Sequence, residues 1–120
     1  MTDGEFTAFC SGYPDYFIEI TAGGEIEIVP PNFSLTGWRN QMINTQWGTW
    51  AIRDGKGAAT EASGGFVLQS GARRSPDAAW TAKARLRELD SESWVGYWHV
   101  APDFLIELGS ETDRLPKLRA

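Results

Sequence analysis

Cysteine and histidine are almost absent from this chain of 120 residues, which contains one of each, Cys10 and His99. A single cysteine excludes an internal disulfide, and one cysteine with one histidine excludes a zinc site built from these ligands. A catalytic Cys–His pair stays open, but a structural histidine is the simpler interpretation of His99, which lies between Trp98 and Val100. The lone thiol favours a reducing cytosol, so we expect a cytoplasmic protein.

Long hydrophobic runs are also lacking. No stretch approaches the roughly 18 apolar residues of a membrane span, and the N-terminus lacks the positive start and apolar centre of a secretory signal. The chain has no glycine-rich phosphate loop, because its two Gly-Gly pairs are typical turn signals. Six Trp and six Phe in a chain of this length predict instead one globular domain over residues 1–120.

The charge is unevenly distributed. A formal net charge of −5 is unfavourable for a nucleic-acid-binding protein, and residues 1–30 contain six acidic residues but no Lys or Arg. Residues 73–87, in contrast, contain five cationic residues and one acidic residue. That basic segment could contact phosphates, although its charge alone favours a solvated helix face.

Apolar periodicity and turn signals predict an α+β protein. Two β-rich runs joined by Thr-Ala-Gly-Gly indicate a hairpin, in which Ile26 and Ile28 alternate with Glu25 and Glu27 as a buried and a solvated face. Ser34 is a candidate N-cap for a long helix that Gly55 closes. The predicted strands cover 16–20, 25–29, 58–62, 66–68, 77–80 and 103–108, and the predicted helices cover 35–53, 82–89 and a segment that starts near 112.

The long predicted helix has an apolar stripe rich in tryptophan. Such a stripe could stack on nucleic-acid bases, but amphipathic helices usually bury it, and we expect it to pack into the core. Its members at helical spacing are Leu35, Trp38, Met42, Ile43, Trp47, Trp50 and Ala51.

Two carboxylates stand at the edge of, or inside, apolar strand-like runs. Asp77 ends Arg-Ser-Pro-Asp at 74–77, and Glu107 lies in Pro-Asp-Phe-Leu-Ile-Glu-Leu at 102–108, where a sheet core would continue. A buried charge there costs several kcal/mol unless it is paired or bound to a metal. If the two carboxylates converge, they form a hard-cation site suited to Mg²⁺. The simpler interpretations are a strand-edge Asp77 and a buried ion pair between Glu107 and an arginine such as Arg74.

The ordered set of motifs over residues 13–120 resembles the Uma2 ("Uma-two") family of bacterial restriction-endonuclease-like proteins with a PD-(D/E)XK core. The resemblance rests on Asp-Tyr-Phe-Ile-Glu at 15–19, Gly-Trp-Arg-Asn at 37–40, Arg-Asp-Gly at 53–55, Gly-Phe-Val-Leu at 65–68, Gly-Ala-Arg-Arg-Ser-Pro-Asp at 71–77 and the Glu107 segment. It implies a restriction-endonuclease-like mixed β-sheet flanked by helices. It also implies a Mg²⁺-dependent endonuclease (a phosphodiester hydrolase) with DNA as its substrate.

The resemblance also assigns residue roles. Asp77 and Glu107 correspond to the metal ligands, and Glu19 corresponds to an upstream acidic residue that completes the catalytic site. The family's lysine would follow Ala120, so we expect the N-terminal portion of the domain, with Lys117 one helical turn earlier as the nearest substitute.

Two other classes of function stay open. One is a non-catalytic module for protein interaction or nucleic-acid binding that keeps the nuclease fold without the lysine, and the other is a chain without function. The sequence predicts no membrane partner and leaves a homodimer open.

Overall fold

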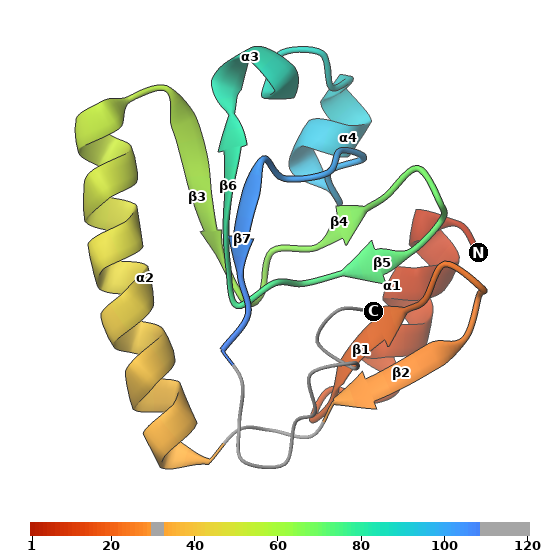
Figure 1. Cartoon of the computed structure of the whole chain (residues 1–120). Coiled ribbons are helices and arrows are strands. Elements are labelled where there is room, and N and C mark those ends of the chain that lie inside the picture. Colours follow the sequence, from red (N-terminus) through yellow and green to blue (C-terminus); the bar gives the residue numbers. More distant parts are fainter. Residues whose placement is uncertain (30–32, 109–120) are drawn as a thin grey trace.

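The computed structural model describes residues 1–29 and 33–108, which form two antiparallel sheets with helices beside them (Figure 1). The predicted α+β class is confirmed. The helix predicted near 112 lies outside the described residues. In chain order the elements are α1 (Asp3–Ser11), β1 (Phe17–Ile20), β2 (Ile26–Val29), α2 (Ser34–Asp54), β3 (Gly57–Glu61), β4 (Phe66–Val67), β5 (Arg73–Arg74), β6 (Ala78–Ala82), α3 (Lys83–Leu86), α4 (Ser91–Val95) and β7 (Phe104–Ile106).

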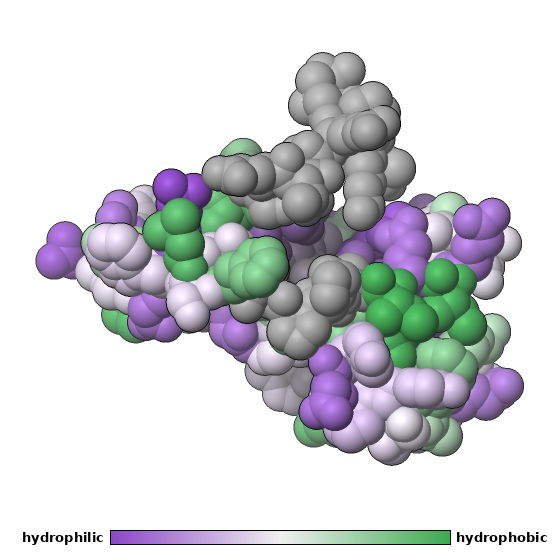
Figure 2. Space-filling model, turned by 90° about the horizontal axis from the view of Figure 1, so that it is seen from below, coloured by the Kyte–Doolittle hydropathy of each residue, from purple (hydrophilic) through white to green (hydrophobic). Residues whose placement is uncertain are grey.

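The first sheet has the strand order β2-β1-β5-β4, and its β1–β2 hairpin turns at Gly24, whose φ is 87°. Phe6 of α1 packs on the buried Ile18 and Ile20 of β1. The prediction of a buried face on β2 is wrong, because Ile28 is 57% exposed although it pairs with Ile18. The reason is that helix α1 covers β1 and leaves the outer strand β2 in solvent. Apolar side chains accordingly gather on the hairpin side of the surface in Figure 2.

Helix α1 was not predicted from the sequence, although a signal for it exists. Thr2 accepts a hydrogen bond from the Glu5 backbone N–H, and Glu5 accepts one from the Thr2 backbone N–H, which is a capping box. Arg73 of β5 fastens this helix to the sheet through a 2.8 Å ion pair with Asp3 and a cation–π contact with Phe6. The N-terminal helix is therefore part of the first sheet's packing.

The second sheet has the strand order β3-β6-β7, and α2 packs beside β3 and β6 (Figure 1). Gly55 ends α2 with a φ of 71°, as predicted, but Phe33 takes the N-cap position that was assigned to Ser34. Two side chains of α2 donate hydrogen bonds to the backbone that leads into and through β6. Trp47 Nε1 donates to the Ala79 carbonyl at 2.9 Å, and Asn44 Nδ2 donates to the Asp77 carbonyl at 3.1 Å.

The prediction that α2 buries its whole tryptophan stripe is wrong. Trp38 is 65% exposed and Trp50 is 46% exposed, whereas Trp47 is half-buried and stacks on Trp50 at 5.4 Å. For Trp38 the reason is the length of the helix, because 21 helical residues span about 31 Å at 1.5 Å per residue. The five-residue strands beside it span only about 17 Å at 3.3 Å per residue. The N-terminal half of α2 therefore extends beyond the sheet.

Close packing between β3 and β6 centres on one glycine. A Cβ atom at Gly57 would lie 2.2 Å from the ring of Trp80, so the indole occupies the space above the β3 backbone. Trp80 also contacts the rings of Trp50 and Phe104. This indole links α2, β3 and β7 in one packing unit.

Candidate functional site

The short link from β5 to β6 carries the chain from the first sheet to the second (Figure 1). At its start, the Ser75 backbone N–H donates a 2.7 Å hydrogen bond to Glu19 Oε2. Pro76 is buried in the middle, where its missing N–H needs no partner. Asp77 follows at the end of the link. The predicted residues Glu19 and Asp77 are thus both anchored to this crossing.

Asp77 is held from two sides. Its carboxylate Oδ2 accepts a 2.7 Å hydrogen bond from the Leu108 backbone N–H, and its carbonyl accepts the bond from Asn44 of α2. A charge-assisted hydrogen bond of this length fixes a carboxylate well. The segment after β7 is therefore attached directly to the Pro-Asp motif.

The β6–β7 register relates Asp77 to Glu107. Ala78 pairs with Ile106, Ala79 with Leu105 and Trp80 with Phe104. The paired residues end at Ala78 and Ile106, so Asp77 and Glu107 are the next residues of the two segments at this end of the strand pair.

The environment of Glu107 differs from the predicted one. Glu107 is exposed, and its neighbour Leu105 is 53% exposed, because β7 is the outer strand of the three-stranded sheet formed within residues 33–108. The cost of burying a charge therefore does not apply to it. Arg74 forms ion pairs with Glu27 and Glu19, on the other sheet, so the alternative of a buried pair between Arg74 and Glu107 is not supported.

Glu19 lies in a compact charged cluster. It faces Glu27 across the hairpin, and Arg74 Nη1 lies 2.8 Å from Glu27 Oε2 and 3.5 Å from Glu19 Oε1. Both oxygens of Glu19 already accept a hydrogen bond, one from Arg74 and one from Ser75. Glu19 therefore positions the link that carries Asp77.

The described residues offer few protein ligands for a metal ion. Within residues 1–29 and 33–108, no three His, Cys, Asp or Glu side chains form a group that could hold a metal ion. Mg²⁺ keeps several waters and is commonly bound by one or two carboxylates together with substrate phosphates. Asp77 and Glu107 fit that donor set. Lys117 lies outside the described residues.

The remaining chemically reactive residues have structural roles in this part of the chain. His99 Nε2 lies 2.8 Å from Asp3 Oδ2, so it ties the β7 side of the molecule to α1. Cys10 packs on the Phe6 cluster, and burial raises the pKa of its thiol, which disfavours the reactive thiolate. Neither residue joins the Asp77 link.

Comparison with known proteins gives one family and no curated relative. No curated protein matches the chain. Among the described helices, none is long and apolar enough to cross a membrane. The family model for Uma2, described as "Putative restriction endonuclease", matches residues 3–120, which include Glu19, Asp77 and Glu107. The chain therefore belongs to the Uma2 family of nuclease-like proteins, and its fold is of the restriction-endonuclease-like type.

Proposed function

We propose that this protein is a Mg²⁺-dependent endonuclease that hydrolyses phosphodiester bonds of DNA at Asp77 and Glu107. The observation that supports the proposal is the β6–β7 register in a member of a restriction-endonuclease family, because Asp77 and Glu107 directly adjoin its terminal pair, Ala78 and Ile106. The lone, weakly acidic thiol suits a reducing cytosol, where bacterial DNA lies.

Each residue has a distinct part in this proposal. A Mg²⁺ ion, when bound, offsets phosphate charge and lowers the pKa of a coordinated water. Asp77 would supply an oxygen whose position the Leu108 N–H fixes, and the exposed Glu107 would supply one that a DNA strand can reach. Glu19 acts through the link, which it holds at Ser75. Lys117 is the candidate for stabilising negative charge that develops on the phosphate.

The test is cleavage of supercoiled plasmid with Mg²⁺ and with EDTA. We expect Asp77→Asn and Glu107→Gln to lower the Mg²⁺-dependent cleavage rate by about 10²-fold or more, because each removes a charged metal ligand. Glu88→Gln, which removes an exposed carboxylate after α3, is the matched control and should cleave at the original rate. Lys117→Ala should lower the rate without changing Mg²⁺ affinity. Cleavage by Asp77→Asn and Glu107→Gln at the wild-type rate would overturn the proposal.

A non-catalytic interaction module is the second candidate, and β7 favours it. Phe104 and Leu105 are more than half exposed on this outer strand, and an exposed apolar edge is a template for pairing with another chain, including a second copy. If no variant and no metal condition produces cleavage, analytical ultracentrifugation of the wild type and of Leu105→Lys tests this alternative. A self-associating wild type and a monomeric variant would support it.

A further inference from the structure

A pocket lies at the opposite end of β6 from Asp77. It has a volume of about 420 Å³ and is lined by Ala58, Lys83, Leu86, Arg87, Leu89 and Trp94. Asp77 precedes the five strand residues of β6 and Lys83 follows them, so the two ends are about 20 Å apart at 3.3 Å per residue. The pocket is therefore separate from the candidate nuclease site.

Two cations of the basic segment are available at this pocket. Arg73, Arg74 and Arg85 each have a carboxylate oxygen within 3.1 Å. Lys83 and Arg87 form no ion pair with any residue in the described ranges 1–29 and 33–108. Once the three arginines are paired with carboxylates, the positive charge of segment 73–87 that is left lies on the two cations that line the pocket.

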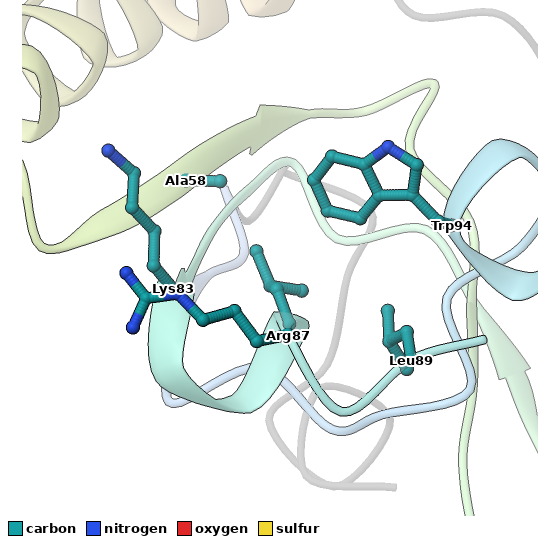
Figure 3. Close-up of a pocket in the computed structure, with 6 residues that line it drawn as sticks. Ala58, Lys83, Arg87, Leu89 and Trp94 are labelled. Atoms are coloured by element: carbon teal, nitrogen blue, oxygen red, sulfur yellow. The ribbon is translucent and has the colours of Figure 1, made fainter. Parts of the chain in front are cut away.

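The cations and an aromatic ring lie on different sides of the pocket. In Figure 3 the Lys83 side chain runs upward and the Arg87 side chain runs leftward past its base, so both charged ends lie on the left of the pocket and the Trp94 ring lies on the right. Trp94 is 52% exposed, and its ring stacks on Trp98 with a centroid distance of 5.4 Å and an interplanar angle of 13°. Trp98 Nε1 also donates to the Trp94 carbonyl. This stacking supports Trp94 from behind, so the ring can offer its other face to a ligand.

We propose that this pocket binds one nucleoside phosphate unit, with the base against Trp94 and the phosphate on Lys83 and Arg87. The volume lies within the range of about 300–1,000 Å³ that is usual for small-molecule sites. Aromatic rings stack on bases of any sequence, and Lys and Arg bind phosphate. The unit is either a free nucleotide or an unpaired nucleotide of a DNA strand. The proposal does not rest on cleavage at Asp77.

The test is binding of fluorescein-labelled dT12 measured by fluorescence anisotropy in EDTA, at two salt concentrations. Lys83→Gln/Arg87→Gln should weaken binding about tenfold or more and reduce its salt dependence. Trp94→Leu should weaken binding about 5-fold to 100-fold, the range expected for loss of one base stack. The matched controls remove two positive charges and one indole from exposed positions on α2, as Arg39→Gln/Arg53→Gln and Trp38→Leu, and should stay within about twofold of the wild type.

Three further measurements complete the test. Competition with dTMP distinguishes the two ligands. Displacement of dT12 by micromolar dTMP identifies a free nucleotide as the natural ligand, and no displacement identifies an unpaired nucleotide of a DNA strand. Unchanged binding by both pocket variants, with unaltered circular dichroism and melting temperature, would overturn the proposal. A second result would also overturn it. If Lys83→Gln/Arg87→Gln loses affinity equally for duplex and single-stranded DNA, and Trp94→Leu loses none, the protein contacts only the DNA backbone. A wild type that binds dT12 in EDTA through Lys83, Arg87 and Trp94 but cleaves no plasmid with Mg²⁺ would count against the nuclease proposal alone, so the two failures are distinguishable.

Discussion

Leu108 donates its backbone N–H to Asp77 Oδ2 at 2.7 Å, so the residue that follows Glu107 is hydrogen-bonded to the carboxylate of the Pro-Asp motif. The two acidic half-motifs are thus joined by a main-chain hydrogen bond as well as by strand pairing. This bond lets the structural role of Asp77 be separated from its proposed role as a metal ligand.

Replacing Asp77 by Asn or by Ala should give different stabilities. Asparagine keeps a carbonyl oxygen for the Leu108 N–H but loses the charge that strengthens this bond, so Asp77→Asn should lower the free energy of unfolding by about 0.5–1 kcal/mol. Asp77→Ala leaves that N–H without its acceptor and should cost about 1–2 kcal/mol. Urea unfolding followed by tryptophan fluorescence measures both. Equal stabilities for the two variants would mean that the bond does not hold the segment after β7.

Alanine should have opposite effects at two glycines. Gly37 lies in α2, and a methyl group added there would have no atom within 4 Å, so Gly37→Ala should stabilise the helix by about 0.5–1 kcal/mol. Gly57→Ala places a methyl group against the Trp80 ring and should destabilise the protein by about 1–3 kcal/mol. Thermal unfolding by circular dichroism reports both changes. A stabilising Gly57→Ala would show that the indole moves freely.

Two tryptophans of α2 should respond differently to phenylalanine. Trp47 donates Nε1–H to the Ala79 carbonyl, so Trp47→Phe should lower the free energy of unfolding by about 1–2 kcal/mol. Trp38 is mostly exposed, and Trp38→Phe should stay within about 0.5 kcal/mol of the wild type. The comparison uses the same urea titration. A larger loss at position 38 would indicate that the N-terminal half of α2 is covered in solution.

Stability should fall at acidic pH in part through Asp103. The Ala82 backbone N–H, and then the charge and hydrogen bond of Arg85, hold the pKa of Asp103 below its ordinary value of 3.8. Because folding lowers this pKa, the ionised carboxylate stabilises the protein above about pH 4, and that contribution is lost as the pH falls through the folded-state pKa. Asp103→Asn should therefore be less stable than the wild type at pH 7.

The expected Asp103→Asn difference at pH 7 is about 1 kcal/mol, because the carboxylate is only partly shielded from solvent. This difference should shrink as the pH falls below 3.8 and vanish once the carboxyl is protonated in the folded state as well. Unfolding measured across this range, with Glu88→Gln as the control for a lost exposed carboxylate, checks the slope. A difference independent of pH would assign the effect to packing and not to charge.

Local patterns were enough to predict most elements, but not what covers them. The hairpin, the end of α2 at Gly55 and the strand that ends just before Glu107 follow from turn chemistry and residue periodicity, which act over a few residues. Exposure of Ile28 and Trp38 depends on how far α1 and the strands reach, which no local pattern contains. Helix α1 was predictable from the Thr2 capping box, a signal confined to four residues at the N-terminus.

The candidate site shows the same division. The assignment of Asp77 and Glu107 came from a family resemblance, and in the fold both residues directly adjoin the last pair of the β6–β7 ladder. The pairing of Arg74 with Glu27 joins segments 47 residues apart, and the sequence offers several equal partners for that arginine. Which cations remain for a ligand therefore became apparent only from the fold.

The Trp80 ring above Gly57 has a consequence for how this sequence can change over evolutionary time. A side chain at position 57 is tolerated only after position 80 has become smaller, whereas position 80 can shrink while position 57 stays glycine. Divergence at this pair is therefore ordered, with the change on β6 first and the change on β3 second. A lineage that has filled position 57 cannot regain the indole without first restoring the glycine.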